Sequence, residues 1–192
     1  NYCRENGISK PGDPQDFQMI YLVDMEHPGL VVFPTHRLVR DLPNFDKEAV
    51  LEKCSEFFYI DEKEGTDTME EDLKKLYDEG KKAFGFYCGK GEWFLLTLKN
   101  IDFMSQMLLD VSKASQSLDV SVLHTLILEK IFGIDKENMA KQINLTYTKF
   151  FTEAIDGVDK GEFQCSFVLN PTRVTEIRDV AAAGEKMPQK ST

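Results

Sequence analysis

The sequence predicts a fold of the α+β or α/β class, in which a mixed sheet with β-hairpins is covered by helices. Strand-like and helix-like segments alternate along the 192 residues without a repeated unit. Two pairs of strand-like runs flank short turns that contain glycine. In addition, the spacing of apolar residues in the segment 118–134 predicts a helix. Apolar side chains lie on nearly all sides of this helix, so other parts of the chain must pack against more than one of its faces.

We expect this segment to form a largely buried helix over residues 118–133, around which the chain is organised. Ser117 or Asp119 can cap its first amide groups, and Gly133 can supply the left-handed residue that ends it. His124 falls at the edge of the apolar arc. A lone histidine there is more often a hydrogen-bonded core residue than a ligand, so we expect His124 to be structural.

Composition narrows the classes of function. The formal charge is −10, with 33 acidic and 23 basic residues, which disfavours nonspecific binding to nucleic acid or to an anionic membrane. The four cysteines form no Cys-x-x-Cys pair, so neither a zinc site nor a disulfide framework is indicated, and a reducing cytoplasm fits best. No apolar run reaches the roughly 18 residues of a membrane span. We therefore expect a cytoplasmic protein without a membrane partner and without a metal site in this chain.

The two ends suggest a piece of a longer protein. Residues 1–5 resemble the end of a helix that stops at Asn6-Gly7. We expect residues 1–16 to be a residual helix and linker from a missing N-terminal half, and residues 17–192 to form a single α/β-type domain.

The remaining elements follow from local patterns. Residues 17–25 and 30–33 are rich in strand formers and flank a turn over 26–29, which predicts a first hairpin. Residues 89–91 contain two glycines but are followed by a strand, so they are not a phosphate-binding loop. The other predicted elements are a helix over 46–57, a strand over 57–60, an amphipathic surface helix within 61–79, a second hairpin of 83–88 and 93–98, a short helix near 103–111, strands over 144–148 and 162–169, and helices over 150–159 and 171–183.

Three short stretches combine basic and hydroxyl side chains. In the first, Arg37 could bind a phosphate or carboxylate with its guanidinium fork, and His36 titrates near neutrality beside Thr35. In an extended chain, His36 and Arg37 face opposite sides, so they can serve one site only if Pro34 bends the strand. The alternative is an ordinary strand end at the surface.

The second stretch, residues 170–173, lies where a strand passes into a helix. Asn170 suits the cap, Pro171 suits the first helical position, and free amides with Thr172 and Arg173 would make a seat for an anion. Many helices begin in this way for stability alone.

The third stretch is the C-terminal segment 186–192. Lys186, Lys190, Ser191 and Thr192 could close over a charged ligand, although a frayed terminus has the same composition.

Four segments in this order resemble the segments typical of one large prokaryotic family, the domain-of-unknown-function family 1015. They are residues 30–38, 118–124, 167–173 and 184–192. Full-length members are about twice this size, and they carry an Asp-Gly-His-His-Arg segment that resembles ParB-type partition proteins and ParB-like free-serine kinases. That segment is absent here. By motif, the resemblance carries over as candidate site residues Thr35, His36, Arg37, His124, Asn170, Thr172, Arg173, Lys186, Lys190, Ser191 and Thr192.

The resemblance implies two functions. The first is the C-terminal domain of a nucleotide- or phosphometabolite-dependent phosphotransferase with a small hydroxyl acceptor such as serine, inactive as a fragment, with ATP or ADP and Mg²⁺ bound in the full-length protein. The alternative is a non-enzymatic ligand-sensing or partition-type adaptor. In both cases we expect a small phosphate-bearing ligand, no nonspecific nucleic-acid binding, and a capacity for homo-oligomers.

Overall fold

The computed structural model describes residues 2–8, 10, 12–14, 17–25 and 27–191. Contacts divide the chain into two compact units, Asn1–Val31 and Val32–Thr192. In the first unit, α1 (Tyr2–Glu5) is the helix expected at the start of the chain. All the other elements named below lie in the second unit.

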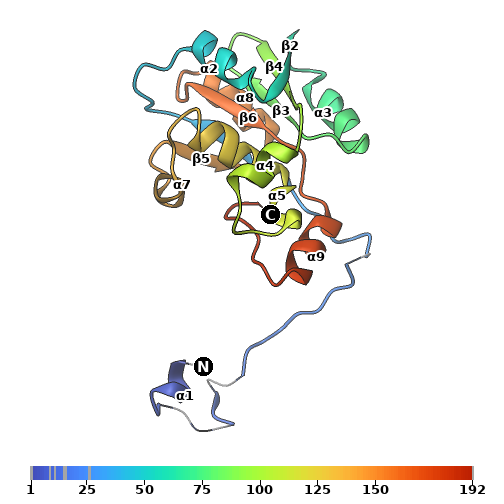
Figure 1. The fold of residues 1–192 in the computed structure, drawn as a ribbon, viewed down its shortest axis with the longest axis vertical. Helices are drawn as coiled ribbons and strands as arrows, with labels where there is room; N and C mark the ends of the chain where they lie inside the picture. Colours follow the sequence, from blue (N-terminus) through green and yellow to red (C-terminus); the bar gives the residue numbers. More distant parts are fainter. Residues whose placement is uncertain (1, 9, 11, 15–16, 26, 192) are drawn as a thin grey trace. The chain divides into compact units, whose positions relative to one another are not determined.

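A six-stranded sheet forms the centre of the second unit (Figure 1). Its order is β2-β4-β3-β6-β1-β5, and every pair among these strands is antiparallel. This pairing confirms the predicted fold class and selects α+β from the two alternatives, but the sheet is entirely antiparallel and not mixed as expected. The strands are β1 (His36–Val39), β2 (Phe58–Glu64), β3 (Ala83–Tyr87), β4 (Glu92–Leu98), β5 (Leu145–Thr148) and β6 (Cys165–Val168).

Helices cover both faces of this sheet, because successive side chains of a strand point to opposite faces. On one face, α2 (Lys47–Cys54), α4 (Asp102–Met107) and the central helix pack against phenylalanines of the sheet. On the other face, α3 (Met69–Asp78) and α8 (Phe151–Asp159) pack around Trp93. The short helices α5 (Lys113–Gln116) and α7 (Lys136–Lys141) and the helix α9 (Val174–Ala182) complete the unit.

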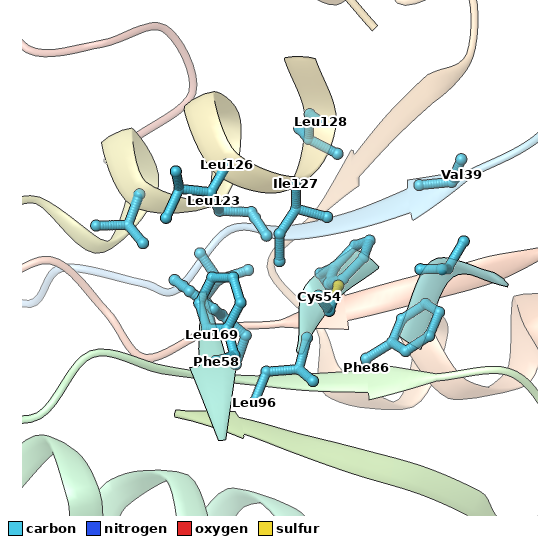
Figure 2. Packing of buried hydrophobic residues seen from close by; sticks show 14 of the residues in the cluster. Val39, Cys54, Phe58, Phe86, Leu96, Leu123, Leu126, Ile127, Leu128 and Leu169 are labelled. Atoms are coloured by element: carbon cyan, nitrogen blue, oxygen red, sulfur yellow. The ribbon is translucent and has the colours of Figure 1, made fainter. Parts of the chain in front are cut away.

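The central helix is buried as predicted, but it is not a regular α-helix. It begins as α6 (Asp119–Val122) and continues as the π-helix η2 (Leu123–Glu129). Amides bond five residues back, from Lys130 N to Thr125 O at 3.2 Å and from Phe132 N to Ile127 O at 3.0 Å. Figure 2 shows Leu123 and Ile127 directed at the sheet. A π-helix is rare and is found frequently at functional sites, so its position is informative.

The predicted N-cap of this helix is wrong and its regular part ends at Glu129, whereas the left-handed conformation predicted for Gly133 is confirmed. Leu118 occupies the cap position and makes no side-chain cap hydrogen bond. Ser117 instead donates to Ala114 O at 2.9 Å, and Asp119 pairs with Lys82 at 2.9 Å. These tertiary partners take the side chains that local spacing assigned to capping. Gly133 has a φ of 71°, the left-handed conformation expected at the end of a helix.

The predicted first hairpin is wrong for the described residues. Residues 17–25 and 30–33 form no strand and are mostly exposed, with Met19 97% exposed. Leu30 N does bond to His27 O at 2.9 Å, as in a β-turn, but Gly29 lacks the positive φ that a type II turn requires. Glu26 lies outside the described residues. Strand propensity alone failed here because a strand also needs a partner strand.

The second hairpin is confirmed, with β3 and β4 antiparallel around residues 89–91. Other boundaries shift. The helix expected within 61–79 begins only at Met69, because residues 58–64 pair with β4. The helix expected from residue 171 begins at Val174, so Asn170 is not its cap and Pro171 is not its first residue.

In the part of the chain that the structure describes, none of the helices is both long enough and apolar enough to cross a membrane.

Candidate functional site

Arg37 is a fully buried arginine on the strand next to one edge of the sheet. It lies on β1, where it is opposite Tyr147 of β5 and Phe167 of β6. Its side chain therefore points to the face that the central helix covers. The guanidinium carbon lies 5.4 Å from the centre of the Tyr147 ring, and Nη2 lies 3.3 Å from Nε2 of His124. Strand register and the central helix together fix the position of this cation.

No carboxylate of the described residues lies within salt-bridge distance of Arg37. Two main-chain carbonyls accept instead, Thr35 O from Nη1 and Lys190 O from Nη2 at 2.9 Å. Nε is buried and has no hydrogen-bond partner. Burial lowers the pKa of Arg37 to about 10, with a smaller opposing effect from Tyr147. Buried charges are normally paired, so this arginine has an unused capacity for an anion.

His36 and Arg37 lie on opposite faces of the sheet, because β1 is extended through both residues. Nδ1 of His36 accepts a hydrogen bond from Leu169 N at 3.2 Å, and Nε2 is buried without a partner. Burial, and secondly the charge of Arg37, lower the pKa of His36 to about 4. His36 is therefore neutral at pH 7. Because it lies on the opposite face of the sheet, it cannot serve the same site as Arg37.

A cavity of about 570 Å³ lies beside Arg37. This is a typical size for a small-molecule site. Its wall includes His124 and Tyr147, both of which contact Arg37, so the cation lies directly behind the wall. The pKa of His124 is lowered to about 3, first by burial and second by Arg37, which keeps the imidazole neutral. The other residues of the wall are Leu108, Asp110, Val111, Ser115, Ser121, Thr125, Glu129, Lys136, Met139, Glu185, Lys186, Pro188 and Gln189.

The π-helix and β5 bring distant parts of the chain to this cavity. His124, Thr125 and Glu129 all belong to η2, and the widened turn places them on one wall together with Ser121. Burial raises the pKa of Glu129, although Lys136 opposes this effect. The cavity thus contains groups of both charges.

Residues 185–191, which we call the strap, form another wall of the cavity. At one end, Glu185 accepts hydrogen bonds from Ser112 N at 2.6 Å, from Ser112 Oγ at 2.8 Å and from Ser115 Oγ. These bonds, with Ser115 the largest contribution, lower the pKa of Glu185. At the other end, Arg37 holds the carbonyl of Lys190. The strap is fastened at both ends.

Ser191 strengthens the second fastening. It is buried, its carbonyl accepts from Thr172 Oγ1 at 2.7 Å, and its own Oγ donates to Pro188 O at 2.6 Å. Of the other predicted residues in this segment, Lys186 lines the cavity and Lys190 contributes through its main chain. Thr192 lies outside the described residues.

Asn170 and Arg173 both contact α3. Asn170 Nδ2 donates to Leu73 O at 3.0 Å. The guanidinium of Arg173 lies 3.9 Å above the Tyr77 ring and donates to Tyr77 O. The main-chain N–H of Arg173 donates to Glu176 at 2.9 Å. This side chain already has partners within the fold, whereas Nε of Arg37 has none.

The structure thus brings Thr35, Arg37, Thr172, Lys190 and Ser191 into one hydrogen-bonded group and places His124 and Lys186 on the adjoining cavity. It does not bring His36, Asn170 or Arg173 into that group. Sequence reasoning missed Tyr147, Glu129, Lys136 and Glu185. Of these, only Glu185 lay inside a recognised segment, and the other three have no local pattern that marks them.

Among the residues that the structure describes, no group of three or more His, Cys, Asp or Glu side chains could hold a metal ion. The three buried or half-buried cysteines of the second unit, Cys54, Cys88 and Cys165, are free thiols. Burial raises the pKa of each of them. They are therefore protonated at neutral pH and are not activated nucleophiles.

A family model described as "Protein of unknown function (DUF1015)" matches residues 1–121, which is more than half of the chain. No curated protein and no solved structure matches it.

Proposed function

The chain belongs to the DUF1015 family of proteins of unknown function, and we propose that it binds a small phosphate-bearing metabolite in the cavity beside Arg37. The family match over residues 1–121 confirms the family assignment, and it covers residues 30–38 and most of residues 118–124, whereas residues 167–173 and 184–192 lie outside it. In the proposal, this chain is the ligand-binding part of a nucleotide- or phosphometabolite-dependent phosphotransferase.

The fully buried charge of Arg37, which no described carboxylate neutralises, is the observation that carries the proposal. Removing a guanidinium from water costs free energy, and an unpaired buried charge is rarely retained without a role. A phosphate near this cation would replace the hydration that the guanidinium loses on burial, because charges attract strongly where the dielectric constant is low. Lys136 and Lys186 on the cavity wall add positive charge that the ligand can reach directly.

The carboxylates of the wall suggest what else the ligand carries. Asp110 and Glu129 face the same cavity, whereas Glu185 is engaged by the serines at the end of the strap. A carboxylate accepts hydrogen bonds, so it suits hydroxyl or amine groups of a ligand. A ligand with a phosphate at one end and a hydroxyl or amine at the other would pair with both the basic and the acidic side chains at the cavity. This combination supports a small hydroxyl-bearing substrate for the proposed transfer.

We assign no step of the reaction to a metal ion. A nucleotide-dependent transfer uses Mg²⁺ to neutralise phosphate charge, and the described residues contain no cluster of three or more His, Cys, Asp or Glu side chains that could hold a metal ion. The role that this chain plays in the proposal is to bind and orient the ligand, with Arg37 and the lysines holding phosphate oxygens.

The proposal is tested by thermal shift and calorimetry with ADP, ATP, phosphoserine and inorganic phosphate. At least one of these should stabilise the parent protein, and the effect should shrink as salt is added. Arg37→Met should abolish the stabilisation, because it keeps the approximate length and the apolar contacts but removes the charge.

Arg40→Met is the matched control. Arg40 follows β1 directly, is exposed, and lies 3.8 Å from Asp41 at the surface. Its variant should respond to the ligands as the parent does. If none of the four compounds stabilises the parent, or if Arg37→Met responds normally, the proposed function is wrong.

A ligand-sensing protein without catalysis is the second candidate. The strap favours it, because a wall that is fastened by a few hydrogen bonds can report whether the cavity is filled. The two candidates differ in turnover. Conversion of ATP to ADP by the full-length protein in the presence of a hydroxyl acceptor such as serine supports the phosphotransferase, and binding by the full-length protein without turnover supports the sensor.

A further inference from the structure

We infer that the strap is a latch that an anion opens, because the carbonyl of Lys190 occupies the place on Arg37 that a ligand oxygen would take. The inference rests on the proposed function and concerns the regulation of the same site.

The donors of Arg37 are only partly used in the closed form. Nη1 donates to Thr35 O, which belongs to the same strand region, whereas Nη2 donates to Lys190 O of the strap at 2.9 Å. Nε has no partner. Together, Nε and Nη2 make the side of the guanidinium that binds two oxygens of a phosphate or carboxylate at once. One half of this fork is empty, and the other half bonds to the strap and lies 3.3 Å from Nε2 of His124.

An anion therefore competes with Lys190. The Arg37 side chain has no exposed surface in the closed form, so a ligand in the cavity cannot reach the fork until the strap moves. A carbonyl is a neutral acceptor, and a charged oxygen makes a stronger hydrogen bond to the same guanidinium. Once the anion takes both Nε and Nη2, the bond to Lys190 is lost.

The two ends of the strap are fastened differently, which decides the end that moves. The Glu185 end is held by three hydrogen bonds to a carboxylate from Ser112 and Ser115. The other end is held by single bonds from Arg37 and from Thr172 Oγ1. Lys190 also has a φ of 56°, a conformation that costs free energy for a residue with a side chain. The Lys190–Ser191 end is therefore the weaker fastening and opens first.

The hydroxyl of Thr172 allows a test that leaves Arg37 unchanged. Thr172→Val removes the bond to Ser191 O but keeps the shape of the side chain, so it weakens the closed form. Because closing competes with the ligand, the affinity for the anion should rise, by about fivefold if one ordinary hydrogen bond is lost. Thr172→Ser keeps the hydroxyl and is the matched control, with the affinity of the parent expected.

Trypsin gives an independent readout, since Lys190 is a cleavage site at the end of the strap that opens. Inorganic phosphate, or ADP in a parallel series, should accelerate cleavage after Lys190 in the parent protein, as followed by mass spectrometry. Thr172→Val should be cleaved faster than the parent even without ligand. Simple binding to a rigid cavity predicts the opposite result, because a ligand then protects the wall that it touches.

The outcomes separate the latch from the proposed function. If ligand binding depends on Arg37 but Thr172→Val binds no more tightly and phosphate slows cleavage, the latch is wrong while the proposed function survives. If no probe binds the parent protein, both are wrong. Tighter binding by Thr172→Val together with faster cleavage in phosphate supports the latch.

Discussion

The guanidinium of Arg37 donates a 2.9 Å hydrogen bond to the main-chain carbonyl of Lys190, a residue 153 positions later in the chain. The bond joins the most buried cation of the described residues to the strap that walls the cavity. Both residues lay in segments singled out from the sequence, yet their contact depends on the packing of the whole second unit.

The first prediction concerns the cost of removing Arg37. Arg37→Met leaves the carbonyls of Thr35 and Lys190 without a donor, but it also removes a charge from the interior, so we expect a modest change in the free energy of unfolding. Arg37→Ala leaves a cavity in addition, and it should be less stable than the Met variant by about 2–5 kcal/mol. Urea denaturation of both variants measures this difference. Equal stabilities would mean that the site is not tightly packed.

The second prediction concerns pH. The pKa values of His36 and His124 are lowered to about 4 and about 3 in the fold, from 6.5 in the unfolded chain. Below pH 6.5 the unfolded chain therefore binds more protons, so stability falls as the pH falls from about 6.5 toward 4. At pH 5 each histidine should cost about 2 kcal/mol, from about 1.4 kcal/mol for each pH unit. Denaturation at pH 7 and pH 5 tests this.

Glutamine variants separate the two histidines from the carboxylates that titrate in the same range. His124→Gln should cost about 1 kcal/mol at pH 7, the value of one hydrogen bond, and should reduce the loss of stability between pH 7 and pH 5. His36→Gln should reduce that loss independently. An unchanged pH dependence in both variants would contradict the assigned pKa shifts. Loss of ligand binding by His124→Gln without loss of stability would contradict a structural role.

The third prediction concerns Lys82, which joins two helices electrostatically. Its ammonium lies 2.9 Å from Asp119 at the start of α6 and 2.9 Å from Glu176 in α9. Lys82→Met leaves both carboxylates without this partner, and Asp119 is almost completely buried. We expect a loss of about 3–5 kcal/mol in the free energy of unfolding. Lys81→Met is the control, because Lys81 pairs with Glu79 at the surface and should change stability by less than about 1 kcal/mol.

The fourth prediction decides whether Arg173 holds the ligand. Its guanidinium stacks on Tyr77 and bonds to the Tyr77 carbonyl, so Arg173→Ala should destabilise the unliganded protein. The thermal shift produced by phosphate-bearing compounds should stay as in the parent. The reverse result, with stability kept and the ligand response lost, would make the start of α9 the anion site in place of Arg37.

Local patterns were sufficient for much of the fold. The helix expected over 46–57 forms as α2, with Asp46 as its cap accepting from Ala49 N at 2.8 Å. The glycines around Lys90 turn the chain between β3 and β4, as their sequence indicates. The buried helix was also predictable, because apolar residues on all sides require burial whatever the partners are. These features follow from residues that are close together in the sequence, so local patterns are enough to predict them.

Local patterns failed where contacts between residues far apart in the sequence decide the local structure. Residues 17–25 have the composition of a strand but pair with no strand in the described structure. The π-helical hydrogen bonds of η2 were not expected, because periodicity at 100° per residue assumes a regular helix. Asp119 and Arg173 suited helix starts by position, but Lys82 and Tyr77 supply their tertiary partners.

For the candidate site, the sequence by itself determined the chemistry, namely a basic residue in a strand, a histidine in a buried helix and a polar C-terminal segment. It also determined that His36 and Arg37 point to opposite faces, since this follows from strand geometry alone. Only the tertiary structure decided that Arg37 is buried without a described carboxylate, that Tyr147 and His124 separate it from a cavity, and that Lys190 closes over it. The reason is that burial and charge pairing depend on which strands and helices become neighbours, and that choice is made by the packing of the entire unit.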